Sequence, residues 1–167
     1  MKYIGAVMIF FTCTLIGTYA ADRKKRALDE CRAFLDMMIY VKNQIGYFSA
    51  PTKEIYRAYE NNILEDIGFL PAIRSCGNDE VYIDAFVSAF DSIEPKLSVS
   101  PDIKRLIRTF GSEIGKSMQP QQMKTFDFCI DNMNEREKEL KTQTQKDVKL
   151  CRVLGISAGA AAVILII

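Results

Sequence analysis

The side chains that most often carry out catalysis or bind metals are scarce in this chain of 167 residues. It contains no histidine, which removes the commonest general base and the commonest metal ligand. A zinc site would then depend on cysteines, but the five cysteines are scattered and no two have CxxC spacing. Isolated thiols suit a reducing cytosol, and we interpret them as small core residues. The sequence therefore predicts no catalytic residue, no cofactor and no metal site.

Two patterns resemble chemical motifs without completing them. Gly115-Lys116-Ser117 looks like the end of a phosphate-binding P-loop, but the position that needs the first glycine holds Phe110. Asp127 and Asp131 stand one helical turn apart and could share a proton, although a solvated helix face explains them more simply. These acids leave one alternative open, a small membrane enzyme or transporter subunit.

The apolar residues, 49% of the chain, are concentrated at its two ends. Residues 3–20 and 153–167 contain no charged side chain. As helices they would be about 27 Å and about 22 Å long, against a bilayer core of about 30 Å. We expect an N-terminal transmembrane anchor over residues 1–20 and a C-terminal transmembrane segment over 153–167, the second helped by local thinning or a partner helix. The alternatives are a cleaved signal peptide and a buried tail.

Basic residues flank both apolar ends. Arg23, Lys24, Lys25 and Arg26 follow the first end, and Lys146, Lys149 and Arg152 precede the second. The positive-inside rule then places the middle domain, residues 21–152, in the cytoplasm. All the acids and every base except Lys2 lie there, so the net charge of this domain is zero. The basic run therefore suggests anionic lipid headgroups rather than nucleic acid as its partner.

Apolar residues in the middle domain recur at helical spacing throughout. They predict a first helix over about residues 22–47 and later helices that begin near Asn78, Ser100 and Pro120. Gly111 is placed to end the helix that starts after Ser100. The fold class is therefore all-α: a cytoplasmic bundle of five or six helices lies between an N-terminal and a C-terminal transmembrane helix. The last helix of the bundle should run into the final segment without a break.

The most specific motifs lie in the last third of the chain. Phe110-Gly111-Ser112-Glu113-Ile114-Gly115 leads through Gln122 to a long charged helix, and Lys149-Leu150-Cys151-Arg152-Val153-Leu154-Gly155 opens the apolar tail. With this order, length and topology the chain resembles the stage III sporulation protein AB family. The N-terminal half matches more loosely, through Ile45-Gly46-Tyr47, and departs from the pattern at Gln44, where an acid is expected.

The resemblance implies a role in a transenvelope complex that links mother cell and forespore in endospore-forming bacteria. The family's soluble domain is similar to the cytoplasmic domain of the platform protein of type II secretion and type IV pilus systems. The implied function is a non-enzymatic platform in the mother-cell membrane facing the forespore. It would couple a cytoplasmic ATPase to channel proteins and contact membrane lipid, with no nucleic acid and no small-molecule substrate. The platform of another secretion or pilus system is the alternative.

The candidate site residues form two groups. Gly111, Gly115 and Gln122 would shape a partner surface or, more simply, a structural turn. The membrane-flanking residues are Arg23, Lys24, Lys25, Arg26, Lys149 and Arg152.

Overall fold

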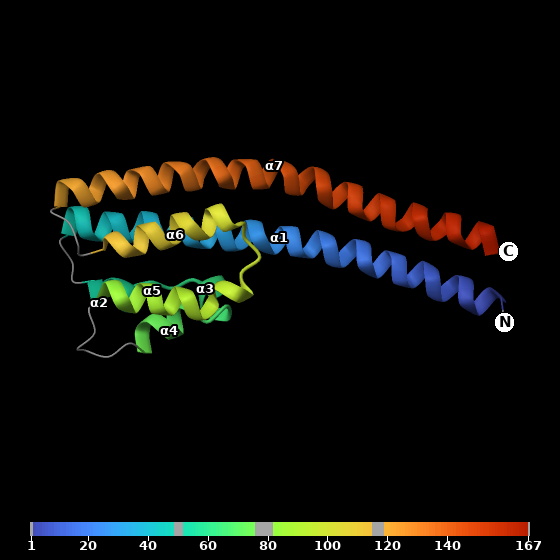
Figure 1. Cartoon of the computed structure of the whole chain (residues 1–167), viewed down its shortest axis with the longest axis horizontal. Helices are drawn as coiled ribbons and strands as arrows, with labels where there is room; N and C mark the ends of the chain where they lie inside the picture. The colour runs from blue at the N-terminus through green and yellow to red at the C-terminus, as the bar shows by residue number, and fades with distance from the viewer. Residues whose placement is uncertain (1, 49–51, 76–81, 115–118, 167) are drawn as a thin grey trace. The chain divides into compact units, whose positions relative to one another are not determined.

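The computed structural model describes residues 2–166 except for 49–51, 76–81 and 115–118 (Figure 1). In this part the chain forms seven α-helices and one 3-10 helix, and no strand occurs there. In chain order they are α1 (Lys2–Phe48), α2 (Thr52–Ala58), α3 (Asn62–Asp66), α4 (Phe69–Ser75), α5 (Tyr82–Ile93), η1 (Glu94–Lys96), α6 (Pro101–Glu113) and α7 (Gln119–Ile166). The all-α prediction is confirmed, but two of the helices are much longer than a bundle of short helices would suggest.

The backbone divides into two compact units. The first unit contains residues 1–28 and 139–167, which are the outer parts of α1 and α7. In it Ala21 and Thr144 are buried, and Lys24 of α1 pairs with Asp147 of α7. The second unit contains residues 29–138 and all the other helices.

The two long helices agree with the sequence signals at their inner ends. The first was expected to end near residue 47, and α1 ends at Phe48. The last was expected to begin near Pro120 and to continue into the final segment, and α7 does both. Proline is tolerated there because the first turn of a helix does not use its amide as a donor. The predicted start at Asn78 lies outside the described residues.

Among the residues that the structure describes, no helix has both the length and the apolar character needed to cross a bilayer. The two transmembrane segments therefore stay predictions from the sequence.

The core of the second unit is built on one face of α1. Its buried residues include Cys31, Phe34 and Met38. The ring of Phe34 packs edge-on against Phe69 and Phe90, with centroid distances of 5.3 and 6.0 Å. Aromatic contacts of this kind connect α1 to α4 and α5.

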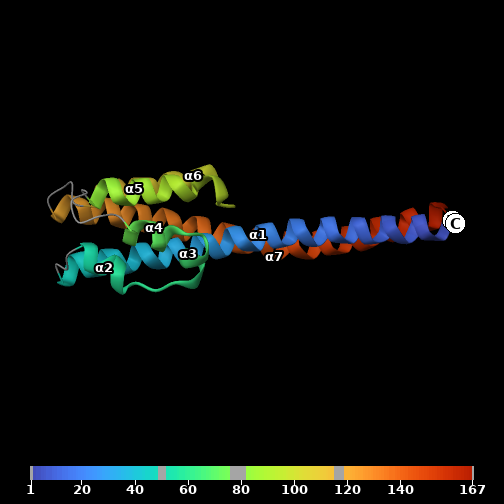
Figure 2. The same ribbon diagram turned by 90° about the horizontal axis from the view of Figure 1, so that it is seen from below.

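Two ion pairs give the register of α1 and α7 in the second unit. Arg32 Nε lies 2.7 Å from Glu137 Oε1, and Lys42 pairs with Asp127. From the first pair to the second, α1 advances ten residues while α7 goes back ten, so the two helices run antiparallel (Figure 2).

Candidate functional site

Gly111 lies in the last turn of α6 and is buried. A methyl group added there would meet the ring of Phe86 on α5, with only 1.9 Å to its Cδ1 atom. The helix continues past Gly111 to Glu113, so the expected helix end at this glycine was wrong. The glycine is needed because α5 and α6 approach closely at this point, and a left-handed turn plays no part.

Gln122 connects the first turn of α7 to the end of α6. Its side chain is buried, and Nε2 donates a hydrogen bond of 2.9 Å to the carbonyl oxygen of Glu113. Carbonyls in the last turn of a helix have no partner within it, so this bond satisfies one of them. One turn on, Phe126 stacks on Phe110 with a centroid distance of 4.3 Å. Gln122 thus joins α7 to α6, whereas Gly111 permits the close packing of α6 on α5. Gly115 lies outside the described residues.

The Gln122 bond can be tested by a substitution that keeps its shape. We expect Gln122→Met to lower the free energy of unfolding by about 1 kcal/mol, because the Glu113 carbonyl loses a buried donor. Urea unfolding followed by circular dichroism measures this difference. Gln121→Met is the matched control, since Gln121 is the exposed neighbour. Equal stability of the two variants would contradict the role given to the bond.

The outer face of the same part of α7 contains a hollow of about 520 Å³. It is lined by Pro120, Gln121, Lys124, Thr125 and Phe128. Phe128 is 59% exposed, although its neighbours Phe126 and Cys129 are fully buried. Phe128 was not among the predicted site residues. The signal that could have identified it is its position, because it is an apolar residue outside the apolar stripe of its own helix.

The two acids considered for proton sharing lie on this exposed side of α7. Asp127 is exposed and pairs with Lys42 of α1, and Asp131 is exposed as well. The ion pair explains the position of Asp127 without a role in proton sharing. Within the described part of the chain, no group of three potential ligands could hold a metal ion.

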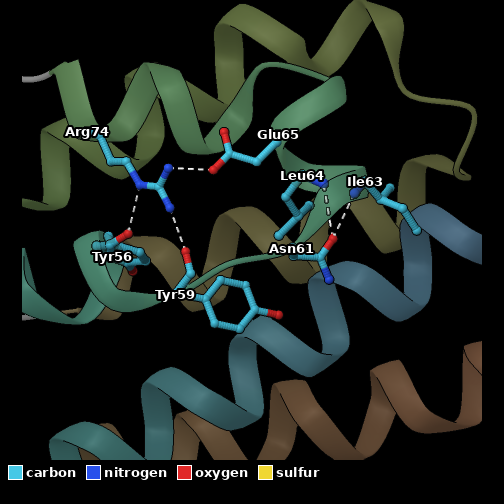
Figure 3. A network of polar contacts seen from close by, with 7 residues as sticks. All are labelled: Tyr56, Tyr59, Asn61, Ile63, Leu64, Glu65 and Arg74. Atoms are coloured by element: carbon cyan, nitrogen blue, oxygen red, sulfur yellow. Dashed lines mark hydrogen bonds and ion pairs between the residues drawn. The ribbon is translucent and has the colours of Figure 1, made fainter.

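A second polar network, which the sequence did not predict, is centred on Arg74 of α4 (Figure 3). Its Nε donates to the carbonyl of Tyr56 at 3.1 Å, and its Nη2 donates to the carbonyl of Tyr59 at 2.6 Å. Its Nη1 forms an ion pair with Glu65 of α3. One guanidinium therefore joins α4 to the end of α2 and to α3.

Other polar groups lie beside this network (Figure 3). The side chain of Asn61 caps α3 by accepting hydrogen bonds from the amides of Ile63 and Leu64, at 3.0 and 3.1 Å. The hydroxyl of Tyr56 is buried without a hydrogen-bond partner among the described residues, and burial raises its pKa above the usual value. Burial also raises the pKa of Tyr59.

The membrane-flanking residues are only partly described. Arg23, Lys24, Lys25 and Arg26 are all exposed on α1, and Lys24 pairs with Asp147. Lys149 and Arg152 belong to α7, but the positions of their side chains lie outside the description.

The cysteines that the structure describes fit the core interpretation. Cys31 and Cys129 are free thiols and both are buried. Desolvation raises the pKa of Cys31 to about 12 and that of Cys129 to about 11. Both thiols therefore stay protonated at neutral pH, which makes them poor nucleophiles.

Comparison with known proteins gives one clear match. The sequence profile of the family described as stage III sporulation protein AB matches residues 2–167. No curated protein and no solved structure matches the chain. Because the matched region is nearly the whole chain, the chain belongs to the stage III sporulation protein AB family.

Proposed function

We propose that this chain is a non-enzymatic platform of a sporulation complex between mother cell and forespore, and that it couples a cytoplasmic ATPase to channel proteins. The observation that carries the proposal is the family match over residues 2–167, which makes the chain a stage III sporulation protein. The family description names a sporulation protein and no enzymatic activity.

The contacts of the second unit support a scaffold. Two of its polar side chains, Arg74 and Gln122, donate hydrogen bonds to backbone carbonyls in or beside neighbouring helices. Such contacts hold neighbouring helices together. The hollow beside Phe128 is open to the surface, as expected for a site that receives a side chain of another protein.

We place the platform in the mother-cell membrane facing the forespore, with the middle domain in the cytoplasm. The uncharged ends and their basic flanks support this proposal. So do the large apolar side chains exposed in the first unit, Leu15 at 66%, Tyr19 at 74% and Val153 at 63%. Lipid would cover Leu15 and Val153, and tyrosine is typical of the level where lipid meets water.

Deletion of the gene tests the proposal. We expect cells to grow normally, to complete engulfment and then to stop, so that the count of heat-resistant spores falls to background. Expression of the intact gene from another locus should restore the spores. Normal sporulation in the deletion strain would contradict the platform role.

A further inference from the structure

We propose that the outer face of α7 around Phe128 is the docking surface for a helix of another protein. That helix would carry an apolar side chain that enters the hollow. Along the helix, an acidic residue would lie on one side of this side chain and basic residues on the other. The inference rests on the proposed function, because it specifies which surface of the platform binds a protein partner and what chemistry the partner presents.

The surface is a stripe of exposed residues at helical spacing, which we call the Phe128 stripe. Its members are all exposed and follow one another at intervals of three and four, namely Gln121, Lys124, Phe128, Asp131 and Glu135. The opposite face of α7 carries Phe126, Cys129 and Met133, which are fully buried. This part of α7 therefore has one face in the core and one face that no other described helix of the second unit covers (Figure 1).

The centre of the stripe has the form of an anchor site. Phe128 stands 59% exposed beside a hollow whose other lining residues include Pro120, Lys124 and Thr125. Interfaces draw most of their binding energy from a few side chains, often aromatic, that fill such hollows. An apolar side chain of the partner would lie against the Phe128 ring and displace water from the hollow.

The charges on the stripe specify the partner. Lys124 lies one turn before Phe128, Asp131 one turn after it and Glu135 two turns after it. None of these three forms an ion pair with any part of the chain that the structure describes, whereas their neighbours Asp127 and Glu137 do. With respect to the described residues, the stripe thus presents one unpaired cation and two unpaired carboxylates in a fixed order. A helix with an acid facing Lys124 and bases facing the carboxylates complements that order.

A second copy of this chain does not fit. Two copies anchored in the same membrane would bring their stripes together in parallel, with Lys124 facing Lys124 and Asp131 facing Asp131. Like charges in contact across an interface oppose binding and exclude wrong partners. The stripe therefore selects a different protein.

The test uses the full chain in sporulating cells, with the photo-crosslinking residue benzoylphenylalanine in place of Gln121 at the edge of the hollow. We expect an adduct with another protein. We also expect the cross-linked peptide, mapped by mass spectrometry, to come from a helix with the stated acid and bases. Phe128→Ala and Lys124→Glu should each reduce the adduct at least tenfold, about the effect of 1.4 kcal/mol. Reversing the mapped acid of the partner to lysine should restore the adduct of Lys124→Glu.

Matched controls separate the stripe from general effects. Tyr47→Ala removes an aromatic side chain that is 82% exposed, and Arg105→Glu reverses an exposed charge on α6. Both should leave the adduct unchanged. All four side chains are exposed, so circular dichroism melts should match the parent chain. The proposal is overturned by an adduct between two copies, by an adduct that survives Phe128→Ala and Lys124→Glu, by a mapped peptide without the charge pattern, or by no adduct.

Failure of the surface can be told from failure of the platform. If gene deletion stops sporulation while Phe128→Ala and Lys124→Glu cells sporulate normally, the surface is wrong and the platform role stands. If the deletion strain sporulates normally, the platform role is wrong, and the cross-link alone decides the surface.

Discussion

Gly111→Ala should lower the free energy of unfolding by about 2 kcal/mol, although the same change inside a helix normally stabilises it by about 1 kcal/mol. The new methyl group would lie 1.9 Å from Cδ1 and 2.1 Å from Cε1 of Phe86. Neither distance is compatible with van der Waals contact, so the ring or helix α6 must move. Inserting a methyl group into a tightly packed core costs about 1–3 kcal/mol and occasionally more.

Phe86 has little freedom to make room. It is fully buried, and its ring lies edge-on to Phe69 at a centroid distance of 5.2 Å and near Tyr56 at 6.2 Å. Movement of the ring would therefore disturb the contacts of α5 with α2 and α4. For this reason we expect the loss from overpacking to exceed the gain in helix propensity.

Urea unfolding of the full chain in detergent, followed by circular dichroism, measures the effect. Gly46→Ala is the matched control, because its added methyl group would lie 3.4 Å from Met123 Sδ, which a flexible side chain accommodates. That variant should be as stable as the parent or slightly more so. Phe86→Leu in the Gly111→Ala background should recover part of the loss, which a double-mutant cycle would show as coupling. A Gly111→Ala variant as stable as the parent would contradict the close packing of α5 on α6.

Local signals allowed much of the fold to be predicted. The start of α6 after Ser100 depends on adjacent residues. The apolar spacing that predicted the helix over residues 22–47 depends on residues within two helical turns. The role of Gly111 was missed because a glycine near a helix end looks the same in sequence whether it ends the helix or accommodates a neighbour. Only the position of Phe86, on another helix, separates the two cases.

The Arg74 network could not be predicted for a related reason. Arg74 lies in the short helix α4, and nothing in the sequence indicates a partner for it. The carbonyl of Tyr56, to which Arg74 donates, lies 18 residues earlier, and backbone carbonyls leave no trace in the sequence. The exposure of Phe128 could not be predicted either, since it depends on how α7 is rotated against the other helices of the second unit.

Arg74→Met should lower the free energy of unfolding by about 3 kcal/mol. Helices α2, α3 and α4 have seven, five and seven residues, and helices this short are not stable alone in water. The variant removes the donors from the carbonyls of Tyr56 and Tyr59 and leaves Glu65 without its cation. Hydrogen bonds from a charged donor contribute about 1.5–3 kcal/mol each, and partial exposure of this side chain reduces that figure.

The Arg74→Met variant should lose stability locally, around the substituted residue, before the whole second unit unfolds. Amide hydrogen exchange in the full chain should speed up first in residues 52–75, because α2 and α3 lose the link to α4. Arg57→Met is the matched control, since Arg57 is exposed and lines a surface hollow together with Arg74. It should change stability by less than about 0.5 kcal/mol. Equal exchange rates in the Arg74→Met and parent chains would contradict the network.

Arg74→Lys and added salt distinguish geometry from charge. Lysine keeps the positive charge near Glu65 but lacks the planar fork that reaches two carbonyls and a carboxylate together. We therefore expect Arg74→Lys to lose about two thirds of what Arg74→Met loses, since two of the three acceptors are backbone carbonyls. Salt at 1 M screens exposed ion pairs but acts little on hydrogen bonds to carbonyls, so the gap between the parent and Arg74→Lys should persist. If the gap closed in salt, or if lysine restored full stability, the charge of Arg74 rather than its fork would join the three helices.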